Sequence, residues 1–150
     1  MREILFVCHG NICRSPVAEI VFNDEIKKSK LASQYYATSY ALSNEEIGND
    51  IYPPMKVVLD KHGHHHAHHR ATRITPEAAN FAYMICYMDD ENFWRLKSQI
   101  PEYMAKFQNI CEFSEGFYEI EDPWYTRRFE LVYNNIKQCV LDLIKHLETL

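Results

Sequence analysis

The sequence of 150 residues contains no long apolar run. The charged pair Arg2-Glu3 is followed by only a short apolar stretch, residues 4–7. A membrane-spanning helix needs about 20 apolar residues, and a secretory leader needs an apolar core of about 7 to 15. We therefore expect neither a membrane span nor a leader. The sequence also lacks an internal repeat and a linker, so we expect one domain over residues 1–150.

Positive charge is not in excess either, because the formal net charge is -5. A negative molecule does not attract nucleic acid, so the balance argues against a general nucleic-acid binder. Any anionic substrate must therefore be bound by a local positive site. We also expect no membrane partner, and the sequence does not predict the oligomeric state.

The cysteines do not form an even set, since there are five of them. They are Cys8, Cys13, Cys86, Cys111 and Cys139. An odd number without a leader favours free thiols in the reducing cytoplasm.

Short apolar segments alternate with segments of helical pattern. The predicted strands are residues 3–7, 35–39, 81–88 and 109–113, and the predicted helices start at Pro16, Met55, Thr75, Asp89 and Phe129. Apolar residues at spacings of three and four make the last helix, which extends to Leu147, the clearest of these. Residues 40–54 are polar and irregular. This alternation predicts an α/β fold, with a four-stranded parallel sheet flanked by helices on both faces.

The segment Cys-His-Gly-Asn-Ile-Cys-Arg-Ser-Pro, residues 8–16, joins the first predicted strand to the first predicted helix. Ligands of open parallel sheets bind at this edge. Consecutive backbone N–H groups and a helix N-terminus both attract anions. Gly10 and Asn11 tolerate the left-handed backbone angles that a tightly curled loop needs. We predict a phosphate-binding loop here, with Ser15 as the N-cap of a helix that begins at Pro16.

Within this loop Cys8 is the predicted nucleophile, because the positive surroundings favour its thiolate. Arg14, six positions later, can bind two phosphoryl oxygens through its planar guanidinium. The hydroxyl of Ser15 can donate to the sulfur and help it leave. A lone cysteine at a strand end is usually an inert buried thiol, but here every neighbour suits an anion site.

Asp122 is the predicted general acid, since a phenolate leaving group needs a proton. It precedes Pro123, which stiffens the turn, and the aromatic residues Trp124 and Tyr125, which could wall a slot for a phenyl ring. Asp-Pro is also a common turn signal on its own.

Together, Cys8–Pro16 with the following Val-Ala-Glu, and the Asp-Pro-Trp-Tyr stretch at 122–125, resemble the low-molecular-weight protein tyrosine phosphatases. Further matches are Glu-Ile-Gly-Asn at 46–49, His-Gly at 62–63 and Met-Asp at 88–89 followed by Asn92. The resemblance covers essentially the whole chain.

The resemblance implies hydrolysis of phosphotyrosine in proteins, with Cys8 as nucleophile, Arg14 as phosphate ligand and Asp122 as general acid and then base. Trp124 and Tyr125 would flank the substrate ring. His9, Gly10, Asn11, Ile12, Cys13 and Ser15 would complete the phosphate-binding loop. No metal or cofactor is implied. Cys13 corresponds to a second loop cysteine that can pair with the nucleophile, or it is simply packed.

The sequence departs from the family pattern at three places. Residue 9 is His, where many members have an apolar or small residue. Tyr35 and Tyr36 stand where the family has Ser-Ala, so no serine partner of Asn11 is evident.

The third departure is the stretch 62–69, with six histidines in eight positions. The family implies one histidine that supports the phosphate-binding loop, and His69 fits best, with His68 as the alternative. The others are interpreted as a solvated loop, an adventitious metal binder or a dedicated metal site.

Four other functions compete with this interpretation. An arsenate reductase would need two further cysteines close together, and Cys86, Cys111 and Cys139 are 25 and 28 residues apart. An arginine phosphatase of the same family tends to have Thr in place of Ile12. A metal-binding module would not need the Cys8 loop, and a pseudoenzyme would not need an intact nucleophile, phosphate ligand and acid.

Overall fold

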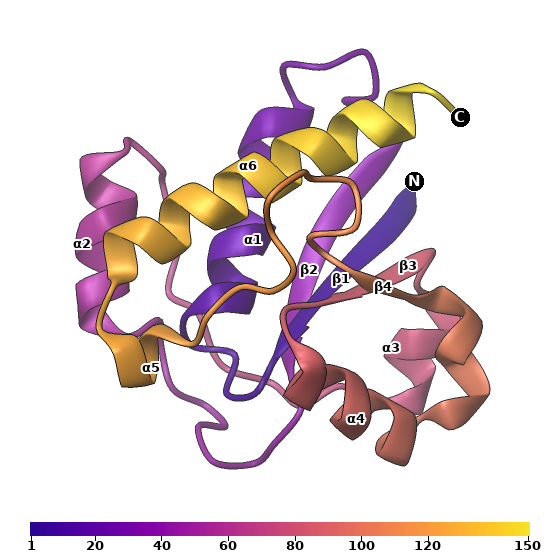
Figure 1. Ribbon diagram of the computed structural model, residues 1–150, viewed down its shortest axis with the longest axis horizontal. Helices are drawn as coiled ribbons and strands as arrows, with labels where there is room; N and C mark the ends of the chain where they lie inside the picture. Colours follow the sequence, from indigo (N-terminus) through magenta and orange to yellow (C-terminus); the bar gives the residue numbers. More distant parts are fainter.

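A computed structural model describes all of residues 1–150. Four parallel strands form one sheet in the order β2-β1-β3-β4 (Figure 1). The strands are β1 (Arg2–Cys8), β2 (Tyr35–Ala41), β3 (Met84–Tyr87) and β4 (Phe107–Asn109). The helices are α1 (Arg14–Ile26), α2 (Pro53–Lys61), α3 (Pro76–Phe81), α4 (Asp90–Gln99), the 3-10 helix η1 (Pro101–Lys106), α5 (Pro123–Thr126) and α6 (Phe129–Glu148). This confirms the predicted α/β class and the four-stranded parallel sheet.

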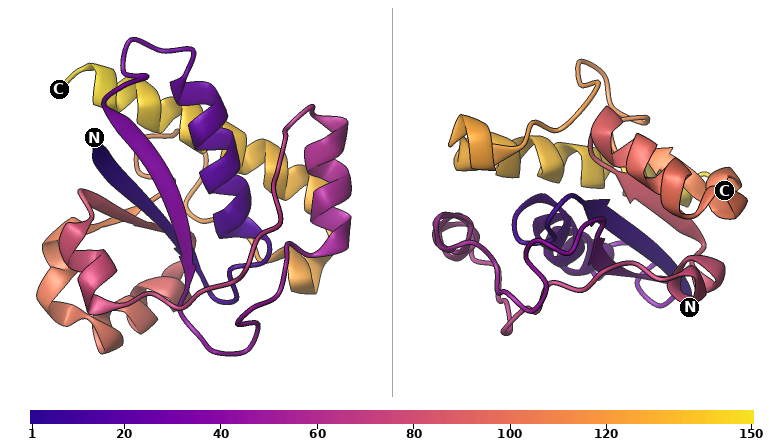
Figure 2. Two further views of the ribbon diagram at one scale, coloured as in Figure 1. Left: turned by 180° about the vertical axis from the view of Figure 1, so that it is seen from behind. Right: turned by 90° about the horizontal axis from the view of Figure 1, so that it is seen from below.

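Helices cover both faces of the sheet (Figure 2). Ile4 and Phe6 of β1 belong to the larger core, which α1, α2 and α6 complete. Leu5 and Val7, which alternate with them, belong to a smaller core formed with α3 and α4. Because β1 is buried on both faces, its sequence is a continuous apolar run rather than an alternating one.

The chain ends lie at the opposite end of the molecule from α5 (Figure 1). Every parallel strand runs from the side of the termini toward the side where the β1–α1 loop and α5 lie. The carboxyl edge of the sheet therefore receives the loops that follow β1, β2 and β3, which is where the sequence predicts the ligand.

Several element boundaries differ from the predictions, and α2, for example, begins at Pro53 rather than at Met55. The fourth strand is Phe107–Asn109, and residues 110–113 turn away. The side chain of Asn109 accepts a hydrogen bond from the N–H of Cys111 at 2.8 Å, and its carbonyl accepts one from Glu112 at 3.0 Å, so a turn ends the strand. The third strand begins only at Met84, since Phe81 is the last residue of α3.

The first helix begins at Arg14, not at Pro16, and its N-cap is Cys13, which makes no side-chain capping bond. Ser15 is therefore not a cap. The short helices η1 and α5 were not predicted. None of the helices combines the length and apolarity that crossing a bilayer requires.

Candidate active site

The loop between β1 and α1 offers a row of unused hydrogen-bond donors. None of the backbone N–H groups from His9 to Cys13 donates a hydrogen bond within the protein. Buried N–H groups normally have partners, and this loop is half-buried to fully buried. The arrangement suits an anion that would accept from several of them at once.

Asn11 holds the loop in shape. Its backbone is left-handed at φ 61°, and it is fully buried. Its side-chain amide donates to the hydroxyls of Ser15 at 2.8 Å and Ser39 at 3.0 Å, and its side-chain oxygen accepts from the N–H of Thr72 at 3.1 Å. Ser39 is thus the serine partner that the sequence did not identify. It lies in β2, four residues after Tyr35.

Gly10 has a different role from the one predicted. Its backbone is not among the left-handed positions. A Cβ atom at residue 10 would instead lie 3.3 Å from the Cγ of Glu46, so glycine is favoured by the close approach of the neighbouring loop.

The sulfur of Cys8 lies 3.1 Å from the hydroxyl oxygen of Ser15, and both residues are buried. Ser15 thus contacts both the sulfur and Asn11. Burial, together with the negative charges of Cys8 and Asp122, raises the pKa of the Cys13 thiol, which favours its protonated form.

Arg14 is only 2% exposed, and three groups hold its guanidinium in place. Nη1 donates to a carboxylate oxygen of Asp89 at 2.6 Å and to the carbonyl of Ile120 at 2.8 Å, and Nη2 lies 3.5 Å from Asp122. Burial lowers the pKa of Arg14, but the charges of Cys8, Asp89 and Asp122 outweigh it and raise that pKa above its ordinary value. The cation is therefore fixed in orientation before any ligand binds.

Asp122 is the N-cap of α5 and accepts a hydrogen bond from the N–H of Trp124 at 3.0 Å. Its side chain is 28% exposed, so it can exchange protons with water or substrate. The ring of Trp124 packs on Tyr52 with centroids 5.0 Å apart, and Tyr125 is exposed beside it. These residues give the pocket an aromatic wall.

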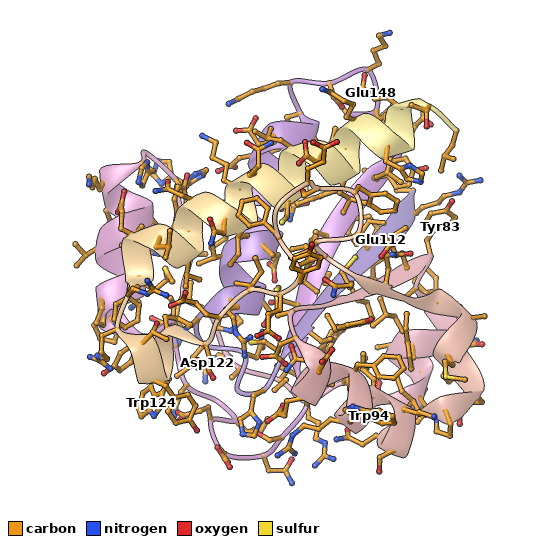
Figure 3. All side chains as sticks on the ribbon, in the orientation of Figure 1. Tyr83, Trp94, Glu112, Asp122, Trp124 and Glu148 are labelled. Carbon is orange, nitrogen blue, oxygen red and sulfur yellow. The ribbon has the colours of Figure 1, made fainter.

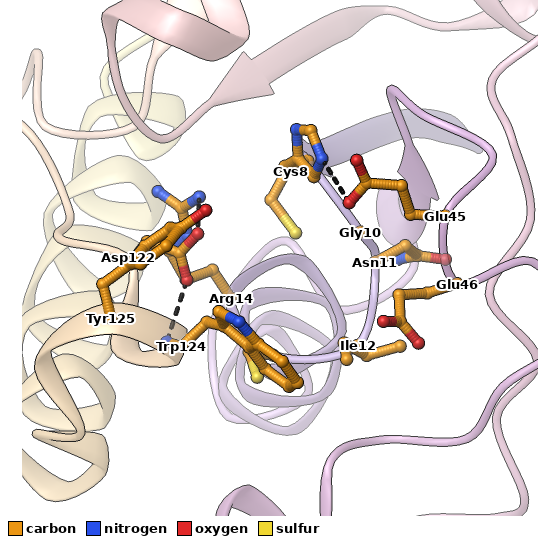
Figure 4. Close-up of a pocket in the computed structure, with 12 residues that line it drawn as sticks. Cys8, Gly10, Asn11, Ile12, Arg14, Glu45, Glu46, Asp122, Trp124 and Tyr125 are labelled. Atoms are coloured by element: carbon orange, nitrogen blue, oxygen red, sulfur yellow. Dashed lines mark hydrogen bonds and ion pairs between the residues drawn. The ribbon is translucent and has the colours of Figure 1, made fainter.

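One pocket brings these groups together. Its lining residues are Cys8, His9, Gly10, Asn11, Ile12, Cys13, Arg14, Glu45, Glu46, Asp122, Trp124 and Tyr125. Asp122, Trp124 and Tyr125 lie on one side, Glu45 and Glu46 lie on the other, and the sulfur of Cys8 lies between the two sides (Figure 4). The pocket therefore places a thiol, a guanidinium and a carboxyl group around one space that also faces the free N–H groups.

His9 lies between two carboxylates. Its Nε2 is 2.9 Å from Glu45 and its Nδ1 is 3.0 Å from Glu91. Glu45 belongs to the loop after β2 and Glu91 to the start of α4, so the imidazole joins the two segments that border the β1–α1 loop. No pattern in the sequence could have identified this bridge, because its members are far apart along the chain.

The histidine-rich stretch contributes one residue near the pocket. His69 Nε2 lies 2.6 Å from the carbonyl oxygen of Asn11, a position that fits support of the loop.

Other histidines of the stretch contact residues away from the pocket. His64 is buried between Asp24 and Tyr133, at 2.6 and 2.5 Å. His62, His66 and His68 contact Glu130, Asp60 and Asp50 respectively. No group of three His, Cys, Asp or Glu side chains that could hold a metal ion is present.

Comparison with known proteins agrees with this geometry. The family model described as low molecular weight phosphotyrosine protein phosphatase matches residues 3–149. A mouse protein named low molecular weight phosphotyrosine protein phosphatase is 36% identical over 145 residues, which cover 92% of this chain and 90% of that protein.

Solved structures agree as well. YfkJ of Bacillus subtilis superimposes with a TM-score of 0.94 at 29% identity, covering 99% of this chain and 96% of its own. A protein tyrosine phosphatase from Entamoeba histolytica superimposes with a TM-score of 0.90 at 26% identity, covering 99% of this chain and 98% of its own. The parallel sheet with its Cys8–Ser15 loop thus defines an enzyme of the phosphatase class. The chain belongs to the low-molecular-weight protein tyrosine phosphatase family.

Proposed function

We propose that this phosphatase hydrolyses phosphotyrosine in proteins through a phosphate ester of Cys8, with all steps carried out by one domain over residues 1–150. The observation that supports this most strongly is the convergence of Cys8, Arg14 and Asp122 on one pocket beside the unused N–H groups of residues 9–13. No metal or cofactor takes part in the proposed reaction.

In the first step, the Cys8 thiolate attacks phosphorus while the bond from phosphorus to the phenolic oxygen breaks. Asp122 gives its proton to that oxygen, so tyrosine leaves neutral. Arg14 and the loop N–H groups donate to the equatorial oxygens, where the charge is spread in the transition state. Because Arg14 is already held by Asp89 and Ile120, little reorganisation is needed.

In the second step, water attacks phosphorus and the phosphorus–sulfur bond breaks. Asp122, now a carboxylate, takes a proton from that water, and the nearby hydroxyl of Ser15 donates to the departing sulfur. Trp124 and Tyr125 would flank the substrate ring, and an aryl group suits them better than the short side chain of phosphoserine.

The proposed partners are phosphotyrosine-containing proteins, and the proposed location is the cytoplasm. The odd number of cysteines, five, supports that location, since an odd set favours free thiols in a reducing compartment.

The test is turnover of p-nitrophenyl phosphate and of a phosphotyrosine peptide by wild type, Cys8→Ser and Asp122→Asn, with and without EDTA. We expect no turnover by Cys8→Ser. Asp122→Asn should lower kcat by about 100-fold to 10,000-fold, the usual contribution of a general acid. The substitution should slow turnover of the peptide more than turnover of p-nitrophenyl phosphate, because the p-nitrophenolate leaving group needs a proton less. EDTA should change nothing.

The control is Asp142→Asn, which removes a carboxylate from α6 outside the pocket. Equal turnover by Asp122→Asn and this control would exclude Asp122 as the acid. Loss of turnover in EDTA would exclude the mechanism as a whole.

A further inference from the structure

Two cysteines outside the pocket bring their sulfur atoms into contact. Cys111, in the turn after β4, and Cys139, in the middle of α6, have their Sγ atoms 3.7 Å apart. The two residues are 28 positions apart in the sequence, and the fold brings α6 back over the turn. Neither residue lines the active-site pocket. Figure 3 shows Glu112, the neighbour of Cys111, well away from Asp122 and Trp124.

The contact changes the acidity of the pair. The contact with Cys111 lowers the pKa of Cys139, because the remaining S–H stabilises the first thiolate to form, and this effect outweighs that of burial. The same contact, with burial, raises the pKa of Cys111. Cys86 has no sulfur neighbour, and burial alone raises its pKa. Cys139 is thus the better thiolate, and a thiolate is the form that attacks an oxidised sulfur.

A surface hollow borders one of the two cysteines. It is lined by Asn109, Cys111, Glu112, Ser114, Phe117 and Tyr118. Cys111 itself is 3% exposed, whereas Cys139 is completely buried. A small oxidant such as hydrogen peroxide can approach Cys111 from the hollow, while a protein-sized oxidant cannot reach either sulfur.

We propose that Cys111 and Cys139 form a second redox site, an intramolecular disulfide made by peroxide and separate from the catalytic thiols. The bond would close a covalent ring over residues 111–139, and this ring contains Asp122 and the whole of α5.

The chemistry balances with peroxide as the only co-reactant. Cys111 sulfur attacks one peroxide oxygen, the O–O bond breaks, and the products are a sulfenic acid and water. The Cys139 thiolate then attacks the Cys111 sulfur and expels hydroxide, which takes up the proton that Cys139 released and becomes water. Two thiols are oxidised by two electrons in all, and one peroxide is reduced to two waters. The first step is slow because the raised pKa of Cys111 leaves little thiolate.

Closure of the ring should stabilise the fold. A cross-link removes chain entropy from the unfolded state, and a loop of this length gives a sizeable effect. We expect the oxidised protein to melt roughly 5 to 10 °C above the reduced protein.

The test uses the full chain carrying Cys8→Ser and Cys13→Ser, so that the catalytic thiols consume no peroxide. After treatment with hydrogen peroxide and blocking of free thiols, trypsin should release residues 107–127 and 138–145, each with one cysteine, as a linked pair. Before the thiols are blocked, the intact mass should be lower by the two hydrogen atoms lost. Dithiothreitol should restore both the mass and the melting temperature.

Cys86→Ala is the matched control, because it removes a buried cysteine that has no sulfur partner, and it should leave the linked pair unchanged. Cys111→Ser and Cys139→Ala should each abolish the pair. Recovery of the two peptides unlinked, whether as free thiols or as sulfinic acids, would overturn the proposal. The peptides are recovered from the Cys8→Ser, Cys13→Ser chain with Cys111 and Cys139 intact, so this outcome does not depend on the folding of the Cys111→Ser or Cys139→Ala variant.

Discussion

Asn11 is the residue on which the shape of the phosphate-binding loop depends. It combines a left-handed backbone with three side-chain hydrogen bonds in a fully buried position. The sequence indicated the backbone part, because Asn is one of the few residues that tolerate this conformation. It did not indicate Ser39 or Thr72, since both partners come from segments that only the fold brings together.

Replacing Asn11 by Ala should lower the free energy of unfolding by about 2 to 4 kcal/mol, since it strains the backbone and leaves buried partners unpaired. Asn11→Gly removes the same bonds but relieves the strain, so it should cost about 1 kcal/mol less. Urea unfolding measures both. Two variants of equal stability would show that the hydrogen bonds alone matter.

His9 has carboxylates at both ring nitrogens. His9→Leu should leave the Glu45 and Glu91 carboxylates without their imidazole partner at the pocket. We expect kcat/KM for a phosphotyrosine peptide with Glu neighbours to fall about 3-fold relative to one with Lys neighbours.

In the same comparison, Glu45→Gln should raise kcat/KM for the peptide with Glu neighbours relative to the peptide with Lys neighbours. Glu148→Gln, at the far end of α6 (Figure 3), should leave this ratio of kcat/KM values unchanged. Identical ratios in all variants would mean that these carboxylates do not affect peptide choice.

The elements divide into those that local pattern specifies and those that it does not. β1 and α6 were predicted because an apolar run and a 3.6-residue periodicity are local properties. The end of β4 was missed because the side chain of Asn109 stops the strand there. The start of α1 was missed because Ser15 contacts Cys8 and Asn11 rather than capping a helix.

The start of α2 and the histidine-rich segment are joined through Asp50. Its carboxylate accepts from Lys56, from the N–H of Ile51 at 2.7 Å and from the N–H of His69 at 3.0 Å. Desolvation raises the pKa of Asp50, but these hydrogen bonds outweigh it and hold that pKa well below its usual range. Asp50 thus anchors the segment that places His69 against the phosphate-binding loop.

Asp50→Asn should lower the free energy of unfolding at pH 7 by about 1 to 2 kcal/mol. Because the pKa of Asp50 is depressed in the folded state, the stabilisation is fully present above the unfolded value of about 4 and is lost as pH falls from there through the folded-state value. Urea titrations from pH 7 down to pH 2 should therefore show the difference in stability between the two proteins shrinking below about pH 4. A difference that stays constant from pH 7 to pH 2 would contradict this origin.

At the scale of the whole molecule, the substrate and the enzyme carry charge of the same sign. The net charge is -5, while phosphotyrosine is a dianion at neutral pH, so the proposed Arg14 site has to attract it locally against the charge of the whole molecule. This balance was evident from composition, and so was the α/β class from the order of elements. The contacts of His9 and of Cys111 could not be predicted from the sequence, because they join residues tens of positions apart.

Raising ionic strength from about 0.02 to 0.2 M should increase kcat/KM for free phosphotyrosine about 2-fold, since salt screens the repulsion. A phosphotyrosine peptide with several lysines should show the reverse trend. A fall in kcat/KM for both substrates would indicate that anions of the salt compete at the phosphate-binding loop instead.

The position of the chain ends has a practical consequence. Both termini lie across the molecule from α5 and the pocket (Figure 1). A fluorescent fusion partner or a surface-coupling tag can therefore be attached at either end while the pocket stays open. Molecules immobilised by one end would present their catalytic face to the solution, which suits the protein to capture of phosphotyrosine proteins on a sensor by a substrate-trapping variant.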